Sequence, residues 1–287
     1  MRQPPDLPQL NDEQFDAIAG LAYRESGIKL VREKKLMVQS RLRHRLRALN
    51  LDAFSAYADH VASEDGASER RFMISALTTN VSQFFREAHH FKMLSDRLMP
   101  MFRQRIERHE RIRIWSAGCS KGQEPYSIAM HLLRLEPALA KANFKILGTD
   151  LDPQVITQAR SAEFNTSELN GVSEDDLNTF TIACGDSQSR RRMSDVLTQV
   201  VSVKELNLFD DWPMQFAFDA IFCRNVMIYF DQSKQAQLWP RFKSALSTAG
   251  LLFLGHSERI LSPNAYGFRS AGPTTYIKCD DAFDWSK

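Results

Sequence analysis

The chain has 287 residues, of which 43% are hydrophobic and 25% are charged. Such a composition is that of an ordinary globular protein, and the length indicates about two domains. The formal net charge of +2 is too small for a nucleic-acid-binding protein as a whole, so any basic surface must be local. The four cysteines lack zinc-binding or redox spacing, and no segment is apolar enough for a secretory signal or a membrane span. We therefore expect a soluble cytoplasmic protein with free thiols.

The first quarter of the chain predicts a small all-α domain. Residues 1–10 are rich in proline and are expected to be disordered, and the helical domain is expected to span residues 11–78. Asn11 with Gln14 three residues later is a helix-capping pattern. Apolar residues then recur at helical spacing in successive segments up to about residue 77. No pattern of catalytic residues lies in this part of the sequence.

The second predicted helix, from about residue 33 to 49, carries a concentration of positive charge. Its outer faces hold Lys34, Lys35, Arg41, Arg43, Arg45 and Arg47. Like charges one turn apart destabilise a helix locally, which favours a polyanionic partner, although a solvated face is an equally good interpretation. No aromatic residue lies between the arginines, and this argues against a surface on which nucleic-acid bases stack.

Residues 79–95 are expected to link the helical domain to the rest of the chain. Thr78, Thr79 and Asn80 are poor residues for a helix interior but suit the junction between an extended segment and a helix. Phe84 is most simply a core anchor. Arg86 could either pair with a nearby acid or reach into a ligand cleft.

The strongest local pattern runs from residue 111 to 152 and predicts a nucleotide-binding βαβ unit. A short apolar strand ends in a small-residue loop containing Gly118 and Gly122, an amphipathic helix follows, and a second strand ends at Asp150. Glycines allow the backbone to approach a ligand, and the helix N-terminus adds a positive dipole. A carboxylate at the tip of the second strand can accept hydrogen bonds from both hydroxyls of a ribose.

The type of cofactor follows from the departures from a dinucleotide fingerprint. The loop has two glycines instead of three, and Asp150 lies further along than the fingerprint requires. Glu124 stands at the helix start, where it would repel a pyrophosphate. A cofactor with an adenosine and a cationic, amino-acid-like end fits better, and S-adenosylmethionine is such a molecule. An ordinary crossover that binds no ligand remains the alternative from this stretch alone.

The remainder of the chain predicts further strands around an irregular region. Residues 164–199 are polar and show little periodicity, which is typical of a functional or inserted segment. A strand is expected at 199–203, another at 218–225 with polar residues at its tip, and another at 250–255. A hairpin formed by 268–270 and 274–278 is expected to close the fold.

Several motifs in chain order resemble the signatures of the CheR family of chemotaxis receptor methyltransferases. They read TTNVSQFFREAHHF, GCSKGQEPYSIAM, GTDLD, FDAIFCRNVMIYFD and GLLFLGHSE. The resemblance extends from about residue 13 to 279. It implies an α/β, Rossmann-like, S-adenosylmethionine-dependent methyltransferase domain at 96–287, with a small β-subdomain inserted at about 170–203 and an all-α domain in front. It also implies the methylation of glutamate side chains on the cytoplasmic domains of chemoreceptors.

The resemblance assigns site residues by motif. The family's cofactor contacts fall on Asn80, Ser82, Arg86, Glu124, Asp150, Asn207, Leu208, Arg224, Asn225 and Tyr229. Ser82 stands where the family more often has threonine, which keeps a hydroxyl. We expect Asp150 to hold the ribose, Glu124 to hold the polar end of the cofactor, and Asn207 with the residue after it to frame the adenine. Arg86 and Tyr229 are the candidate catalytic residues, which would position the substrate carboxylate.

The resemblance also suggests partners. Acidic receptor helices could dock on Arg41, Arg45 and Arg47, and a receptor C-terminal peptide is a further candidate partner of the β-subdomain. No metal, nucleic acid or membrane insertion is expected, and we expect a monomer. One alternative is a nucleic-acid methyltransferase, but Cys223-Arg224-Asn225-Val226 differs from the Asn/Asp-Pro-Pro-aromatic motif of amino-group methylation. The other alternative is a non-catalytic, cofactor-binding scaffold.

Overall fold

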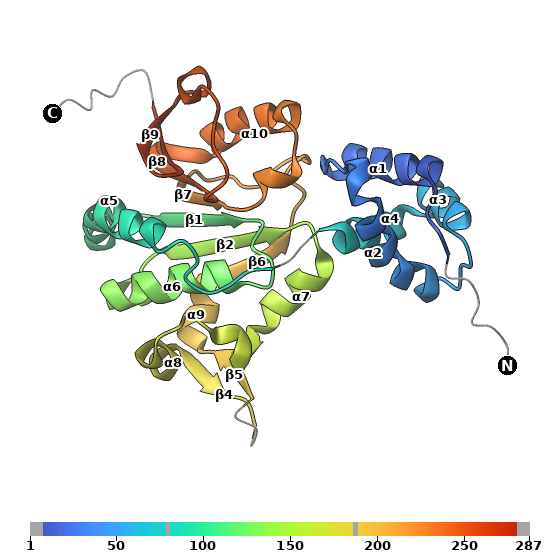
Figure 1. The fold of residues 1–287 in the computed structure, drawn as a ribbon. Coiled ribbons are helices and arrows are strands. Elements are labelled where there is room, and N and C mark those ends of the chain that lie inside the picture. The colour runs from blue at the N-terminus through green and yellow to red at the C-terminus, as the bar shows by residue number, and fades with distance from the viewer. Residues whose placement is uncertain (1–7, 79–80, 186–188, 280–287) are drawn as a thin grey trace. The chain divides into compact units, whose positions relative to one another are not determined.

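The computed structural model describes residues 8–78, 81–185 and 189–279. The chain divides into two compact units, which Figure 1 shows in ribbon form. Among the described residues, the first unit consists of 8–78 together with 229–231, and the second of the remaining residues from 81 to 279. No helix in the described part of the chain is long and apolar enough to cross a membrane.

The first unit is helical, as predicted. Its elements are α1 (Asp12–Ser26), η1 (Arg32–Lys34), α2 (Lys35–Ala48), α3 (Phe54–Ala62) and α4 (Ala67–Leu77). The predicted cap of α1 is confirmed, because the Asn11 side chain accepts from the Gln14 N–H at 2.8 Å and the Gln14 side chain accepts from the Asn11 N–H at 3.0 Å. Apolar stripes meet in a core that includes Phe15, Leu42 and Tyr57.

A short segment from late in the chain completes this unit. Residues 229–231 cluster with the helices and not with the sequence that surrounds them. The Lys29 N–H donates to the Tyr229 carbonyl oxygen at 2.9 Å, and the Tyr23 hydroxyl donates to the Asp231 carboxylate at 3.1 Å. The helical unit is therefore built from two separate stretches of sequence.

The second unit is built on a seven-stranded sheet with the order β6-β2-β1-β7-β8-β10-β9. The strands are β1 (Ile112–Ala117), β2 (Phe144–Asp150), β6 (Val201–Glu205), β7 (Phe218–Cys223), β8 (Leu246–Leu254), β9 (Phe268–Gly272) and β10 (Thr275–Lys278). The sheet is parallel from β6 to β8, and β10 runs antiparallel to both of its neighbours. The strand order reverses between β1 and β7, and the crevice at the carboxyl ends of strands at such a point is where doubly wound sheets bind ligands.

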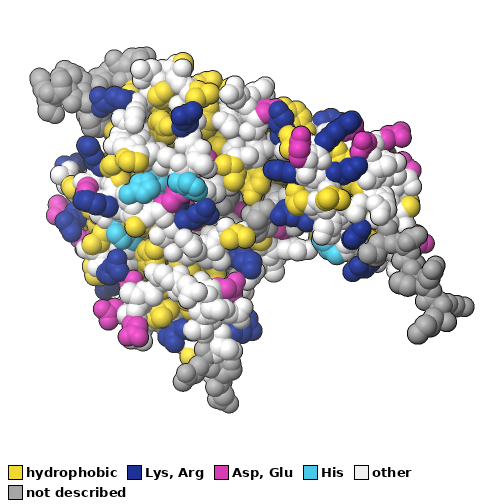
Figure 2. All heavy atoms as spheres, in the orientation of Figure 1, with side chains coloured by type: hydrophobic (Ala, Val, Ile, Leu, Met, Phe, Trp, Pro, Cys, Tyr) yellow, Lys and Arg dark blue, Asp and Glu magenta, His cyan; other side chains and the backbone are white. Residues whose placement is uncertain are grey.

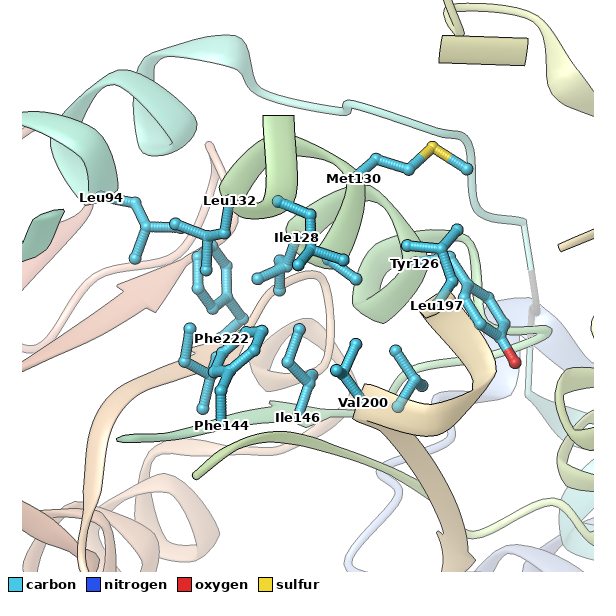
Figure 3. Close-up of a cluster of buried hydrophobic side chains, with 14 of the residues drawn as sticks. Leu94, Tyr126, Ile128, Met130, Leu132, Phe144, Ile146, Leu197, Val200 and Phe222 are labelled. Carbon is cyan, nitrogen blue, oxygen red and sulfur yellow. The ribbon is translucent and has the colours of Figure 1, made fainter. Parts of the chain in front are cut away.

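Helices cover the sheet and bury its side chains on both faces. They are α5 (Ala88–Glu107), α6 (Gln123–Leu135), α7 (Pro153–Ser161) and α10 (Gln232–Ala245), with 3₁₀ turns η2 (Pro137–Lys141), η4 (Met227–Tyr229) and η5 (Pro263–Tyr266). Successive residues of a strand point to opposite faces. Ile114 accordingly joins the core under α5 and α6, whereas the ring centroid of Trp115 lies 5.7 Å from that of Phe242 in α10. Figure 3 shows Ile128 of α6 pointing toward the strand residue Ile146.

A small antiparallel sheet with the order β3-β5-β4 lies within the second unit. Its strands are β3 (Glu163–Asn165), β4 (Thr181–Ala183) and β5 (Arg190–Met193), and it is accompanied by η3 (Thr166–Leu169), α8 (Glu174–Phe180) and α9 (Asp195–Val200). The predicted fold class, an α/β methyltransferase-like domain with a small β-insertion behind a helical domain, is confirmed. The small sheet begins at Glu163, before the predicted limit of about 170. Residues 199 and 200 lie in a helix and not in the expected strand, which starts at Val201.

Candidate functional site

The loop after β1 needs glycine for steric reasons. Gly118 has φ +79°, and a Cβ at this position would lie 2.3 Å from Cγ2 of Val226. Gly122, with φ +97°, is the residue from which α6 starts. The N–H groups of Gly118 and Cys119 both donate to the Thr149 carbonyl oxygen, at 2.7 and 2.9 Å. The loop is thus fastened beside the end of β2.

Asp150 lies at the tip of β2 and faces this loop. One of its oxygens accepts from the Ser120 N–H at 2.8 Å, and the other accepts from the Asp152 N–H at 3.0 Å. Burial raises the pKa of Asp150 to about 6, although these two N–H donors oppose the rise. Because a carboxylate has about four acceptor sites, Asp150 still has two for a ligand.

The neighbouring strand end carries the residues predicted to frame an adenine. The Leu206 N–H donates to the Asp150 carbonyl oxygen at 2.9 Å, so the chain after β6 leaves the sheet beside β2. The side-chain oxygen of Asn207 accepts from the Phe209 N–H at 3.1 Å and shapes the turn, and Leu208 is buried. The structure therefore brings Asn207 and Leu208 to the same end of the sheet as Asp150, where the parallel strands β2 and β6 finish.

Glu124, in the first turn of α6, is buried and already engaged by protein groups. Its Oε1 accepts from the Ser116 hydroxyl at 2.6 Å, and its Oε2 accepts from Nε of Arg224 at 2.6 Å. The carboxylate thus joins the end of β1 to the residue that follows β7. Any contact between Glu124 and a ligand would use the acceptor sites that these two bonds leave.

Arg224 is held from several sides and is only 6% exposed. Besides Glu124, its guanidinium donates through Nη1 to the carbonyl oxygen of Arg86 and lies 3.4 Å from Nδ1 of His90. Arg224, which was predicted to contact the cofactor, therefore also joins α6 to the segment that contains Arg86. Nothing in the sequence around Arg224 indicates this, because its partners lie far away along the chain.

Asn225 follows in the left-handed conformation, with φ +60°. Its N–H donates to Oε2 of Glu258 at 2.8 Å, and Glu258 also accepts from the N–H groups of Gly255 and Ile228, at 2.5 and 3.1 Å. Sequence reasoning gave Glu258 no role. The signal that could have identified it is an acid in the GHSE motif shortly after an apolar strand.

Arg86 lies in the segment that leads into α5. It is half-buried, and among the described residues no hydrogen bond or ion pair involves its guanidinium, which leaves that group available to a ligand. Ser82 is half-buried in the same segment. Asn80 lies outside the described residues.

Tyr229 occupies a different position from the other candidates. It ends η4 and belongs to the helical unit, whereas Arg86 and Asp150 belong to the second unit. It follows Asn225 by only four positions along the chain. Its catalytic role stays a prediction.

The three arginines predicted to dock a receptor differ in their surroundings. Arg41 donates through Nη1 to the carbonyl oxygens of Leu77 and Thr78, at 2.8 and 2.9 Å, and so caps the end of α4. Arg45 binds the carboxylate of Glu69 with both Nε and Nη2, at 2.9 and 2.6 Å. Arg47 is exposed and has no such partner in the described part of the chain.

The helical unit's surface is consequently less basic than its sequence indicates. On the face drawn in Figure 2, Lys and Arg side chains are interspersed with Asp and Glu side chains. Lys35, for example, lies 2.5 Å from the carboxylate of Asp12. The guanidinium groups of Arg41 and Arg45 bind groups of the helical unit itself. Of the three arginines predicted to dock a receptor, Arg47 is therefore the one that we keep as a candidate.

Comparison with known proteins gives consistent results for both units of the chain. A family model described as the S-adenosylmethionine-binding domain of CheR methyltransferase matches residues 80–277, and one described as the all-alpha domain of CheR methyltransferase matches residues 13–78. A probable chemotaxis protein methyltransferase of Rhizobium etli is 43% identical over 258 residues, which are 89% of this chain and 96% of the relative. The chemotaxis protein methyltransferases of Salmonella typhimurium and Escherichia coli are 38% identical over 274 residues, which are 95% of this chain and 92% and 93% of theirs.

Proposed function

Because the chain belongs to the CheR methyltransferase family, we propose that it transfers a methyl group from S-adenosylmethionine to glutamate side chains on the cytoplasmic domains of chemoreceptors. The products are glutamyl methyl esters and S-adenosylhomocysteine, and the reaction takes place in the cytoplasm. The observation that carries the proposal is the match of both family models, in order, over residues 13–78 and 80–277.

The geometry of the β1–α6 loop supports the binding of S-adenosylmethionine. Asp150 has two acceptor sites left for the hydroxyls of a ribose, and Gly118, with φ +79° and packed against Val226, gives the loop the tight turn that places it beside Asp150. Among the described residues, Oε1 of Gln123 is buried at the start of α6 without a hydrogen-bond partner, so it is available to a donor. Asn207 and Leu208 border the same sheet edge, where an adenine would lie next to the ribose.

The chemistry requires positioning rather than proton transfer. S-adenosylmethionine supplies a methyl group on a sulfonium, which is already activated, and a glutamate carboxylate is already an anionic nucleophile. The residues therefore need no general base, and alignment of the reactants can contribute about 7–11 kcal/mol. We assign that task to Arg86, whose guanidinium can bind a carboxylate through two parallel hydrogen bonds. Tyr229 is the second candidate for holding the acceptor.

Methyl transfer from labelled S-adenosylmethionine to a panel of receptor cytoplasmic fragments, with and without their C-terminal peptides, tests the proposal. We expect transfer to glutamates of at least one fragment. The variant Arg86→Ala should lose transfer about 100-fold or more, whereas its affinity for S-adenosylhomocysteine should change far less. The matched control is Lys92→Ala, whose side chain is 77% exposed, and it should behave like the wild type.

Different failures have different meanings. If Arg86→Ala loses cofactor affinity and transfer equally, Arg86 does not position the substrate. If the wild type methylates no fragment but still binds the cofactor, a scaffold role replaces the enzymatic one. If it methylates nucleic acid in a parallel assay, the acceptor is wrong.

A separate proposal concerns the docking of acidic receptor helices on Arg47. An exposed, unpaired cation raises the rate of encounter with an anionic partner, and salt screens the effect. Arg47→Glu should lower kcat/KM most at low ionic strength. Arg108→Glu, at a side chain that is 69% exposed in the second unit, is the charge-matched control. Equal effects of the two variants would refute docking at Arg47.

A further inference from the structure

The backbone around Arg86 is held in an unusual conformation. The two residues that flank it, Phe85 and Glu87, have φ +53° and +59°, in the left-handed region. Each such residue without glycine costs roughly 1–2 kcal/mol, so the surrounding contacts have to stabilise this turn. Strained backbone of this kind is concentrated at functional sites. The contacts that fix the turn therefore also fix the direction of the Arg86 side chain.

One contact acts on each residue of the turn. The Phe85 N–H donates to the hydroxyl of Ser127 in α6 at 3.0 Å. The carbonyl oxygen of Arg86 accepts from Arg224, which is itself bound to Glu124. The third contact comes from Glu87.

Glu87 connects the turn to the segment after β8, which contains His256, and to Arg224. Its Oε1 accepts from the His256 N–H at 2.9 Å, and its Oε2 lies 3.6 Å from Nη1 of Arg224. The side chain is only 9% exposed. Oε2 also lies 3.3 Å from Nδ1 of His90, so its negative charge faces both that imidazole and the Arg224 guanidinium.

The groups around Glu87 keep its carboxylate ionised near neutral pH. Burial by itself raises the pKa of Glu87, but hydrogen bonding by His90 and by the His256 N–H, together with the Arg224 charge, lowers it to about 2. Burial lowers the pKa of His90, so that this imidazole is neutral near pH 7. His90 also lies 2.9 Å from the Thr274 hydroxyl through Nε2. Two further histidines lie in this cluster: the ring centroid of His89 is 4.0 Å from that of His90, and Nδ1 of His256 is 3.3 Å from Oε1 of Glu87. The ionised Glu87 carboxylate therefore faces the Arg224 guanidinium at 3.6 Å.

We infer that Glu87 is a positioning residue for methyl transfer: with Arg224, it holds the strained turn that aims the Arg86 guanidinium at the acceptor carboxylate. This inference rests on the proposed function and deepens it. Glu87 touches neither cofactor nor substrate in this scheme. It acts because its carboxylate fixes the backbone on one side of Arg86 and keeps the Arg224 guanidinium on the carbonyl oxygen of Arg86.

The substitution Glu87→Gln tests the charge while it keeps the shape and an acceptor for the His256 N–H. We expect kcat to fall about 10- to 100-fold, because a small misplacement of a positioning group has an effect of this size. The KM for the receptor fragment and the affinity for S-adenosylhomocysteine should change by less than about threefold, since uniform binding is retained. Lys92→Ala, in the helix that follows the turn, is again the control.

A double-mutant cycle separates positioning from general destabilisation. If Glu87 acts through Arg86, then Glu87→Gln should cost less than about threefold in an Arg86→Lys background, whose point charge does not need the orientation of a planar fork. The same factor in both backgrounds would overturn the inference, and so would an unchanged kcat in Glu87→Gln.

A readout that does not require activity keeps this test independent of the proposed function. Amide hydrogen exchange in residues 84–91 should be faster in Glu87→Gln than in the wild type, and unchanged in Lys92→Ala. If exchange is unaltered, Glu87 does not hold the turn. If the wild type transfers no methyl group at all, the proposed function fails, and the exchange result still decides whether Glu87 fixes the turn.

Discussion

Asp150 makes the affinity for the cofactor dependent on pH. Burial raises the pKa of this carboxyl to about 6 in the free protein. The ionised form is the one that can accept hydrogen bonds from both ribose hydroxyls while it keeps those from Ser120 and Asp152. Binding therefore favours deprotonation, and the affinity should reach its maximum about one unit above pH 6 and decrease as the pH falls through 6.

The size of the effect follows from the pKa. At pH 5, one unit below it, about one Asp150 carboxyl in ten is ionised. The apparent affinity for S-adenosylhomocysteine should then be about tenfold lower than at pH 7.5, which corresponds to about 1.4 kcal/mol. Each further unit of acidity should weaken binding by about another factor of ten, as long as the protein stays folded.

Calorimetric titration with S-adenosylhomocysteine between pH 5 and 8 measures this dependence, and circular dichroism at each pH checks the fold. The amine and carboxyl of the ligand do not titrate in this range. Asp150→Asn is the control: it should bind more weakly than the wild type at pH 7.5, with little change in affinity between pH 5 and 8. A wild-type affinity that is constant over the range, or an equal dependence in Asp150→Asn, would refute the assignment of Asp150 to the ribose.

Three other substitutions probe the framework of the two units. Arg45→Ala leaves the buried carboxylate of Glu69 without its cation. It should reduce the free energy of unfolding, measured by urea titration, by about 3–5 kcal/mol. The double substitution Arg45→Met with Glu69→Gln should recover part of this loss. Gly118→Ala should abolish cofactor binding in calorimetry, because the added Cβ clashes with Val226; normal affinity would mean that the loop rearranges freely. Glu258→Gln should lower the free energy of unfolding by about 1–3 kcal/mol, because one of its three backbone donors then faces an amide N–H, and an unchanged urea midpoint would show that the carboxylate is dispensable.

Local patterns predicted the parts of the fold that depend on neighbouring residues. The cap at Asn11, the loop with Gly118 and Gly122, and the strand that ends at Asp150 are all where the sequence indicates. Each depends on steric or hydrogen-bonding preferences within a few positions. The short strands β3, β4 and β5 were not predicted one by one, because three or four residues are too few to show an alternating pattern.

Long-range pairing explains what the sequence could not predict. Arg45 was predicted to belong to a basic surface that docks a receptor, but its guanidinium pairs with Glu69 from another helix. Arg224 was predicted to contact the cofactor, but in the structure its guanidinium also binds Glu124, which lies 100 positions away in the sequence. Charge runs alone do not tell which cations are neutralised, because that depends on where the tertiary fold places the acids.

The contribution of residues 229–231 to the helical unit has a practical consequence for exchanging modules between relatives. A chimaera cut at the junction near residue 79 would take the helices from one parent and the Tyr229–Asp231 segment from the other. The Tyr23 hydroxyl would then meet a foreign residue in place of Asp231. A graft that also transfers these three distant residues keeps the unit's own partners together, so the natural unit of recombination is discontinuous in the gene.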